Sequence, residues 1–261
     1  MASGRRILVV GGGLGIGQKV TQYLLQHHTA KVVVFGLHVA PELGPLASTG
    51  RLHIVQGDAT SDAARAQARE AVLEFMGGID TLVITVGVMG EIQRLGGMSS
   101  VKLLQTYSIN VFAPMLMCQT FLPELRKTRG DIIILSSTVD KNVKYAGWIQ
   151  YCSSKAALTR FIQVLAHEES DVKVHGVYPG LTKTTMPAEI IAGKFTGIMT
   201  DDEVQKFRNW DKLGEIEPPE WCANAVAKLA ARDIPVWTNG VCRYYYEYDP
   251  DCRNLRGSAQ L

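Results

Sequence analysis

The chain has 261 residues, of which 46% are hydrophobic and 20% are charged, with 27 Lys and Arg residues against 25 Asp and Glu residues. This length is enough for one α/β domain with a sizeable core, and the hydrophobic content excludes a disordered chain. Because the net charge is only +2 and the charges are interspersed, we expect no nucleic acid partner.

Apolar runs and helical patterns alternate along the chain. Six runs are typical of strands buried on both faces, over 7–10, 32–35, 52–55, 81–86, 132–135 and 172–177. Helices are predicted over 16–26, 62–75, 101–125, 153–169 and 221–231. This serial order predicts a doubly wound, Rossmann-type α/β fold, with a mostly parallel sheet flanked by helices on both faces. Ligands of such sheets bind at the carboxyl ends of the strands.

A glycine-rich segment joins the first predicted strand to the first helix. Gly11, Gly15 and Gly17 have the spacing G-x-x-x-G-x-G, and Ile16 lies within it. Glycine permits a tight turn there and lets backbone N–H groups approach a pyrophosphate, which the helix N-terminus also attracts. Since the spacing is not the G-x-G-x-x-G fingerprint, the segment indicates either a dinucleotide site or a plain tight turn.

Tyr151 and Lys155 lie four residues apart in an alanine-rich helical segment, so their side chains share one helix face. A phenol with a pKa of about 10 is a poor proton shuttle at neutral pH, and a nearby cation lowers that pKa. Such a pair could protonate a carbonyl oxygen or deprotonate an alcohol. Tyr and Lys at this spacing are also common on solvated helix faces. The surrounding sequence must therefore decide between a proton-transfer pair and an ordinary exposed helix face.

The context is the buried strand over 132–135, which ends in Ser136 and Ser137 at the ligand-binding edge. With these residues the chain resembles the short-chain dehydrogenase/reductase family over essentially its whole length. The matching order is a glycine loop, an aspartate after the third strand, a mid-chain asparagine, a serine after the fifth strand, Tyr-x-x-x-Lys and Pro-Gly. The resemblance implies a single domain over 1–261, with a dinucleotide-binding half over about 1–130 and a catalytic and substrate part over about 131–261.

The resemblance implies roles for the matching residues. Tyr151 would be the general acid/base, and Lys155 would lower its pKa and bind the nicotinamide ribose. Ser137 would orient the substrate oxygen, and Asn110 would distort its helix to hold a water that connects Lys155 to solvent. The implied cofactor contacts are Gly11, Gly15, Ile16, Gly17, His38, Asp58, Gly87, Tyr151, Lys155, Pro179, Gly180 and Thr184.

Several of these residues have simpler explanations. Asp58 could cap a turn or a helix, and Pro179 with Gly180 could form a turn alone. The chain also departs from the family pattern at Thr85, whose hydroxyl would have to brace the central strand in place of an asparagine. Ser137 precedes Tyr151 by 14 positions, one more than is common in the family, so Ser136 and Thr138 are alternative serine-type candidates.

The coenzyme is predicted to be NADP(H) in preference to NAD(H). The second strand ends in Phe-Gly-Leu-His over 35–38, without the acidic residue that binds a ribose 2′-hydroxyl and without Arg or Lys. His38 could donate to a 2′-phosphate, or it could be a solvated loop histidine. The segments over 122–127 and 151–158, with Tyr248–Asp249–Pro250, look most like fungal benzil reductases and their sepiapterin-reductase-like relatives, which use NADPH.

The connection over about 181–217 predicts either a lid over the substrate or a helical flap that packs on the core. Tyr145 and Trp148 could form an aromatic wall for a flat ketone, although core packing is as reasonable for Trp148. Alternating aromatic residues over 244–248 suggest a C-terminal strand. The expected substrate contacts are Ser137, Tyr145, Trp148, Tyr151 and Met186.

We therefore expect an NAD(P)H-dependent reductase of a small-molecule ketone or aryl diketone. The alternatives are a dinucleotide-sensing regulator and a non-redox cyclase or dehydratase on the same fold. The family implies a homodimer or homotetramer, formed through the helices over 101–125 and 153–169. The five cysteines show no metal-binding spacing, and we expect no metal. With no signal peptide, membrane span or peroxisomal address at 259–261, the expected compartment is the cytoplasm.

Overall fold

The structure is a computed structural model that describes residues 4–141, 143–232, 239–249 and 251. Pro250, the fifth cysteine Cys252 and the C-terminal tripeptide over 259–261 lie outside these residues, so the expectations on them stay predictions. Within the described residues, no helix is both long enough and apolar enough to cross a membrane.

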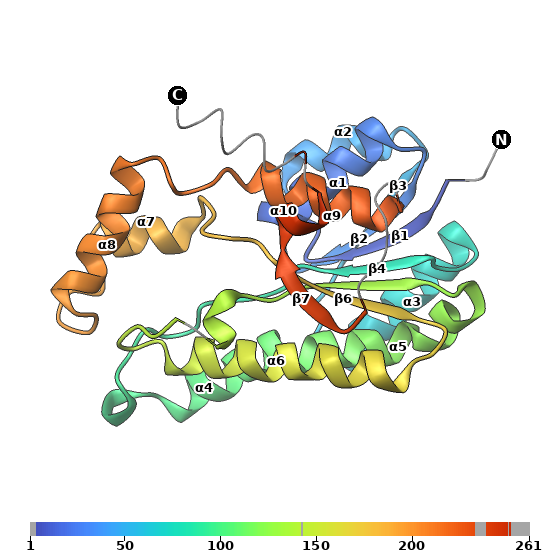
Figure 1. The fold of residues 1–261 in the computed structure, drawn as a ribbon. Coiled ribbons are helices and arrows are strands. Elements are labelled where there is room, and N and C mark those ends of the chain that lie inside the picture. Colours follow the sequence, from blue (N-terminus) through green and yellow to red (C-terminus); the bar gives the residue numbers. More distant parts are fainter. Residues whose placement is uncertain (1–3, 142, 233–238, 250, 252–261) are drawn as a thin grey trace.

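Seven strands form one sheet in the described part of the chain, and every neighbouring pair is parallel (Figure 1). The order β3-β2-β1-β4-β5-β6-β7 places the first three strands on one side of the centre and the last four on the other. The strand order therefore reverses between β1 and β4, which is where such sheets bind ligands. The strands are β1 Arg6–Val10, β2 Lys31–Gly36, β3 Leu52–Gln56, β4 Thr81–Ile84, β5 Asp131–Leu135, β6 Lys173–Tyr178 and β7 Val241–Tyr244.

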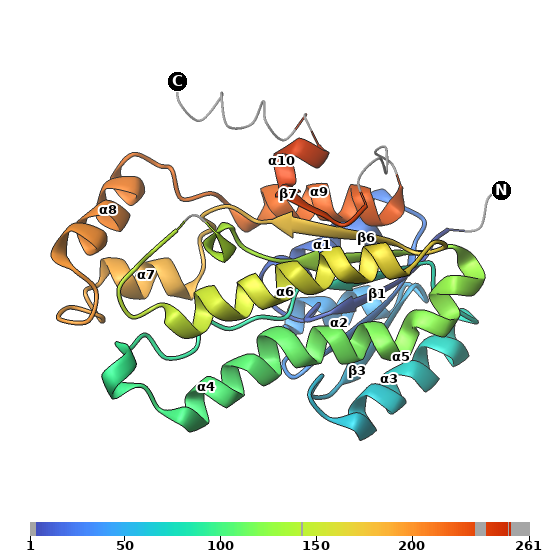
Figure 2. The same ribbon diagram turned by 60° about the horizontal axis from the view of Figure 1, so that its bottom comes forward.

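Helices cover both faces of the sheet, as Figures 1 and 2 show. Helices α1 and α9 pack on one face and bury one apolar cluster, while α3, α5 and α6 pack on the other face and bury a second. The doubly wound fold predicted from the sequence is confirmed. The helices are α1 Gly15–His27, α2 Gly44–Ala47, α3 Asp62–Met76, α4 Ser100–Tyr107, α5 Ala113–Thr128, α6 Ile149–Glu168, α7 Thr185–Ile191, α8 Asp201–Lys212, α9 Pro219–Ala231 and α10 Tyr245–Tyr248.

The helix predicted over 101–125 consists of three successive parts. A π-helical turn over Ser108–Phe112 separates α4 from α5, and α5 continues to Thr128 with Pro123 inside it. A π-turn is a local widening of the helix, and such turns often lie at functional sites. Asn110 is inside this turn, so the helix distortion expected at this residue is present.

The prediction of a strand over 244–248 is wrong for the residues after Tyr244. Residues Tyr245–Tyr248 form the short helix α10, in which the side chains of Tyr245 and Tyr248 are both buried. The Tyr245 hydroxyl lies 3.0 Å from a Glu217 carboxylate oxygen, and the Tyr248 hydroxyl donates to the Gly176 carbonyl at 3.0 Å. Two buried side chains three residues apart fit one face of a helical turn, whereas a strand would place them on opposite faces.

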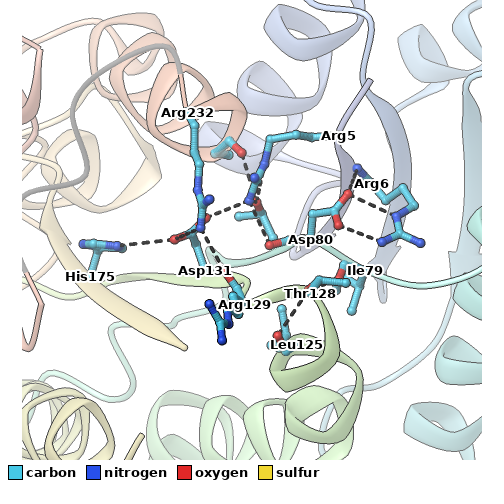
Figure 3. Close-up of polar contacts among 12 residues, drawn as sticks. Arg5, Arg6, Ile79, Asp80, Leu125, Thr128, Arg129, Asp131, His175 and Arg232 are labelled. Carbon is cyan, nitrogen blue, oxygen red and sulfur yellow. Dashed lines mark hydrogen bonds and ion pairs between the residues drawn. The ribbon is translucent and has the colours of Figure 1, made fainter. Parts of the chain in front are cut away.

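Ion pairs cross-link the amino-terminal ends of the central strands (Figure 3). Asp131, the first residue of β5, accepts hydrogen bonds from Arg5 Nη2 and from Arg232 Nε, each at 2.7 Å. His175 Nε2 lies 4.0 Å from the other Asp131 oxygen. Arg5 precedes β1 and Arg232 follows α9, so the buried Asp131 carboxylate joins two strands and a helix at this edge. The ligand-binding edge lies at the opposite ends of the same strands.

Candidate active site

A cavity of about 950 Å³ lies at the carboxyl ends of the strands. Its wall includes residues that follow each of the first six strands, the end of β7 and the segment of α7 and α8. Of the residues expected at the site, Asn110 alone does not line this cavity. The others in its wall are Gly11, Gly15, Ile16, Gly17, His38, Asp58, Gly87, Ser137, Tyr145, Trp148, Tyr151, Lys155, Pro179, Gly180, Thr184 and Met186.

The glycine loop forms a turn, the glycine cradle, that leaves no room for a side chain at Gly11 or Gly17. Gly11 has φ of +78°, and Gly15, the first residue of α1, has φ of +55°. A Cβ atom on Gly17 would collide with the Gly11 carbonyl oxygen and with the Thr85 hydroxyl. Leu14 at the N-cap makes no side-chain hydrogen bond to the helix, so the first N–H groups of α1 have no side-chain cap from it. This bare, close-fitting turn suits a pyrophosphate.

Thr85 connects the two central strands of the sheet, as expected from the sequence. Its hydroxyl donates to the Val10 carbonyl at 3.0 Å, which ties the end of β4 to the end of β1. The predicted strand over 81–86 ends at Ile84, and both Thr85 and Val86 line the cavity. The prediction that this hydroxyl braces the centre of the sheet is confirmed.

Ser137, Tyr151 and Lys155 meet on one wall of the cavity. Helix α6 begins at Ile149, four residues before the predicted helix, so Tyr151 lies in its first turn and Lys155 in the next. Lys155 Nζ donates to the Leu135 carbonyl at 3.1 Å and lies 6.0 Å from the centre of the Tyr151 ring. Ser137 lies two positions after Leu135, and its side chain forms a hydrogen bond with the Tyr151 phenol.

Burial dominates the electrostatics of this group. It raises the pKa of Tyr151, and the hydrogen bond with Ser137 only partly offsets that rise. Burial also lowers the pKa of Lys155 to about 8. The lowered pKa expected for Tyr151 is therefore not found: burial of the phenol raises it, and the group that acts in the opposite direction is Ser137 rather than Lys155. A phenol that stays protonated at neutral pH suits a proton donor.

The geometry separates the alternative serine-type candidates. Ser136 is buried, and its hydroxyl lies 2.7 Å from the Thr159 hydroxyl. Ser136 is therefore hydrogen bonded to Thr159 and not to Tyr151. Thr138 lines the cavity, but the hydrogen bond to the Tyr151 phenol comes from Ser137. Ser137 is thus the best placed of the three residues.

Asn110 is fully buried one layer behind the cavity wall. Its Nδ2 donates to the Val88 carbonyl at 2.8 Å and to the Ser154 hydroxyl at 3.0 Å, and its Oδ1 accepts from the Val88 N–H at 2.8 Å. A Cβ atom on Gly87 would lie 3.2 Å from Lys155 Nζ and 3.6 Å from Asn110 Oδ1. Glycine at this position therefore keeps the space between the asparagine and the lysine open.

His38 and Asp58 lie on the same part of the wall, beyond the ends of β2 and β3. Asp58 Oδ1 accepts the Thr60 N–H at 2.8 Å, so this carboxylate stabilises a turn as well as facing the cavity. His38 is exposed. Among the described residues that line this end of the cavity, none is Arg or Lys.

Aromatic side chains surround the other end of the cavity. The Tyr145 ring centre lies 4.6 Å from that of Trp148 and 5.4 Å from that of Phe207, and Phe207 in turn lies 5.2 Å from Trp210. Trp148 both packs in a buried cluster and lines the cavity, so its two proposed roles are compatible. Tyr244, from the aromatic run over 244–248, also lines the cavity. Phe207 was not expected at the site, and the i, i+3 spacing of the apolar Val204 and Phe207 is the signal that could have indicated its buried position.

Helices α7 and α8 pack over this end through an apolar cluster separate from the two clusters of the sheet. Glu203 connects α8 to the segment before Tyr151. One of its carboxylate oxygens accepts the Thr200 N–H at 2.8 Å as part of a capping box, and the other accepts the Ala146 N–H at 2.9 Å. One side chain therefore caps α8 and fastens it to the cavity wall.

Replacing Glu203 by alanine is expected to raise KM for the substrate more than it lowers kcat, because α8 loses its attachment to the wall. Loss of the capping box is also expected to lower the free energy of unfolding by about 1 kcal/mol. Steady-state kinetics and denaturant titration measure both effects. The control is Glu189→Ala, which removes an exposed ion pair with Lys194 within the same segment. Equal KM values for the two variants would contradict this role of Glu203.

The doubly wound sheet, the glycine cradle at its switch point and the Ser-Tyr-Lys group facing the same cavity define a nucleotide-dependent oxidoreductase of the Rossmann type. The family model described as short chain dehydrogenase matches residues 5–194. An uncharacterized oxidoreductase of Saccharomyces cerevisiae is 32% identical over 252 residues, covering 95% of this chain and 97% of that relative. The chain belongs to the short chain dehydrogenase family.

Further similarities agree with this assignment. A benzil reductase ((S)-benzoin forming) of Saccharomyces cerevisiae is 27% identical over 252 residues, covering 91% of this chain and 94% of the relative. The crystal structure of the uncharacterized yeast protein has a TM-score of 0.87 at 31% identity, covering 96% of this chain and 99% of that one. The KRED1-Pglu enzyme has a TM-score of 0.84 at 29% identity, covering 92% and 99%. The resemblance inferred from the sequence motifs is confirmed, and so is the assignment as an oxidoreductase. Members of the family bind a nicotinamide dinucleotide and act on small molecules.

Proposed function

We propose that this protein is an NAD(P)H-dependent carbonyl reductase that transfers a hydride to a ketone or an aryl diketone. The observation that carries this proposal is the position of Tyr151. Its phenol is hydrogen bonded to Ser137, and its ring centre lies 6.0 Å from Lys155 Nζ, in the same cavity that the aromatic side chains line. A carbonyl group bound there would have a proton donor on one side and the glycine cradle at the other end of the same cavity.

The reduced nicotinamide, when bound, supplies the hydride to the carbonyl carbon. The Tyr151 phenol donates its proton to the carbonyl oxygen, so the product is an alcohol. The Ser137 hydroxyl stabilises the phenolate that remains, since its hydrogen bond favours the charged form. Lys155, with a pKa lowered to about 8, is mainly protonated at neutral pH and places a positive charge beside that phenolate. The space left by Gly87 allows Asn110 to hold a water that resupplies the proton through Lys155.

The cofactor contacts proposed here follow from the cradle and its neighbours. The loop from Gly11 to Gly17 would hold the pyrophosphate, Lys155 the nicotinamide ribose, and Thr184 the carboxamide. NADP(H) is the proposed coenzyme, because no carboxylate follows β2 to repel a 2′-phosphate and His38 is exposed on the cavity wall. Remaining proposed contacts are Ile16, Asp58, Pro179 and Gly180.

The proposed substrates are aryl ketones and vicinal aryl diketones. The rings of Tyr145, Trp148, Phe207 and Trp210 offer flat apolar surfaces, and aromatic pairs prefer the offset and edge-to-face arrangements that these rings would allow. Met186 adds an adaptable apolar contact. The similarity to a protein named benzil reductase supports the same class.

The proposal is tested by incubating purified protein with NADPH or NADH and benzil, with an aliphatic ketone of similar size as the comparison. We expect loss of reduced cofactor with formation of the hydroxyketone, faster with NADPH and with the aryl substrate. Tight cofactor binding without oxidation of the cofactor by any carbonyl would instead favour a dinucleotide sensor. Conversion of a substrate without consumption of cofactor would favour a non-redox cyclase or dehydratase.

We also propose that the protein forms a homodimer, which could pair further into a tetramer, in the cytoplasm. Large apolar side chains are exposed on neighbouring helices: Val101 and Leu104 on α4, Met115 on α5 and Ile149 on α6. Phe112 lies between α4 and α5 and is 49% exposed. Pairing of these helices with a second copy would remove the apolar surface from water.

Replacing Phe112 by aspartate is expected to shift the protein towards a monomer, because a charge would be desolvated in the proposed interface. Size-exclusion chromatography with light scattering measures the mass directly. The control is Leu213→Asp at the end of α8, where an equally apolar side chain is 69% exposed outside the proposed interface. A Phe112→Asp variant with the same mass as the wild type would contradict this interface.

A further inference from the structure

We propose that Gln150 is a positioning residue that sets the direction of the Tyr151 phenol through a buried hydrogen bond to Thr106. This inference rests on the proposed function, because it concerns the proton donor of the same reaction. Gln150 does not line the cavity, and its side chain is directed into the protein, where it is 0% exposed. Thr106 lies on α4 and is 2% exposed.

The start of α6, the helix that carries Tyr151, has no side-chain cap. Trp148, its N-cap residue, makes no side-chain hydrogen bond to the first turn. N-cap side chains normally bind one of the free N–H groups there and fix the first turn. The side chain of Gln150, the second residue of α6, instead joins that turn to α4. The Thr106 hydroxyl lies 2.8 Å from Gln150 Oε1, across 44 positions of sequence.

The hydrogen bond between Thr106 and Gln150 connects α4 to α6. Thr106 Oγ1 also lies 2.9 Å from the Lys102 carbonyl of its own helix, and a hydroxyl has one proton to donate. Gln150 Nε2 is buried and has no partner among the described residues. If the amide is turned over, Nε2 donates to Thr106 and the Thr106 hydroxyl donates to Lys102, so both donors are satisfied. Either orientation makes the same Gln150–Thr106 contact.

A third segment closes over this pair. Gly90 follows β4 and has φ of +72°, and a Cβ atom there would collide with the Thr106 hydroxyl and lie 2.8 Å from Gln150 Oε1. Gln93 N donates to the Gly147 carbonyl at 3.1 Å, which holds the same loop against the residue before Trp148. Since the start of this loop lines the cavity at 86–89, Gln150 lies where the loop, α4 and the first turn of α6 meet.

Consecutive residues of a helix point about 100° apart, so fixing the Gln150 side chain fixes the rotation of the turn that carries Tyr151. A phenol turned away from the substrate oxygen would transfer its proton more slowly, because small misplacements of a catalytic group lower the rate steeply. Cofactor binding depends mainly on the glycine cradle at the other end of the cavity and is expected to change little.

The test is the variant Gln150→Met, which keeps the length of the side chain and removes both amide groups. We expect kcat for the aryl diketone to fall about 10- to 100-fold, with little change in KM or in the Kd of the cofactor. The solvent isotope effect on kcat should increase, since proton transfer would limit turnover. The pH profile of kcat should move, because the phenol would sit differently between Ser137 and Lys155.

Thr106→Val removes the same hydrogen bond from the other side and is expected to reproduce these changes. Thr106→Ser keeps the hydroxyl and should retain near wild-type kcat. The matched control is Thr128→Val, which removes a 2.8 Å hydroxyl bond to the Ile79 carbonyl at the opposite edge of the sheet (Figure 3) and should lower stability alone.

The inference is overturned if Gln150→Met and Thr106→Val lower the melting temperature as Thr128→Val does but keep the wild-type kcat, isotope effect and pH profile. Failure of the proposed function looks different, because the wild-type protein itself would then reduce no carbonyl, and both proposals would fall. If Gln150→Met does not fold, Thr106→Val still decides the question through the same three measurements.

Discussion

Replacement of Tyr151 by phenylalanine is expected to lower kcat for carbonyl reduction by about 10²- to 10⁴-fold, the usual contribution of a positioned general acid. The ring stays in place beside Lys155, and the loss is confined to the hydroxyl that donates the proton. Because the glycine cradle is unchanged, the Kd of the reduced cofactor should stay measurable and close to the wild-type value. Stopped-flow or steady-state loss of NADPH, with fluorescence titration of the cofactor, separates the two effects.

Tyr145→Phe provides the matched control for this experiment. It removes another phenol hydroxyl from the wall of the same cavity, in a residue that makes aromatic contacts with Trp148 and Phe207. We expect Tyr145→Phe to keep most of the wild-type kcat. Wild-type turnover by the Tyr151→Phe variant would show that another group donates the proton.

Replacement of Asp131 by alanine is expected to lower the free energy of unfolding by about 3–5 kcal/mol, as is typical when one partner of a buried ion pair is removed. The Asp131 side chain is 1% exposed, and it lies between the guanidinium groups of Arg5 and Arg232. The alanine variant would leave these two positive charges close together without the carboxylate that separates them. Urea titration at neutral pH measures the difference.

The effect of Asp131 should also depend on pH. Burial alone would raise the pKa of this carboxyl group, but hydrogen bonds from His175 and Arg232 and the charges of Arg232 and Arg5 together lower it. A carboxyl group with a lowered folded-state pKa adds stability above its unfolded pKa of about 3.9, and that stability is lost as the pH falls through the folded value. The difference between wild type and Asp131→Ala should therefore be constant near neutral pH and shrink in acid.

Asp171→Ala is the control for both measurements, since Asp171 is 55% exposed and lies 3.7 Å from Arg129 on the surface. Its removal should change the free energy of unfolding by less than about 1 kcal/mol. A loss as small as this for Asp131→Ala, or a loss that does not diminish in acid, would contradict the stabilising role assigned to the buried carboxylate.

The architecture could be predicted from the sequence because its strands are buried on both faces. Runs such as the one over 132–135 contain no polar residue, so they differ from the alternating pattern of a strand with one exposed face. Their alternation with helical segments permits few other topologies. Element ends were harder, since they depend on tertiary contacts. Tyr245 and Tyr248 follow strand-forming residues directly, and the contacts that fold them into a helix come from Glu217 and Gly176, distant in the sequence.

The candidate site was predictable where it uses residues next to strand ends. Tyr151, Lys155 and Ser137 follow this rule, and the topology brings them to one cavity. Phe207 could not be assigned in this way, because it lies within α8 and not next to a strand end. The i, i+3 spacing of Val204 and Phe207 indicates a buried helix face but not the cavity that this face lines. The pKa of Tyr151 was also misjudged, since spacing along a helix gives the proximity of a lysine but not the extent to which both groups are buried.

The position of the Thr85 hydroxyl limits which side chains residue 85 and the glycine loop can carry. This hydroxyl fills the space directly beneath the glycine cradle, so that Cβ atoms at Gly11 and Gly17 would both reach it. A side chain longer than threonine at position 85 would have to share this space with the loop. Residue 85 and the glycine loop therefore pack directly against each other, and a substitution at either one acts on the other.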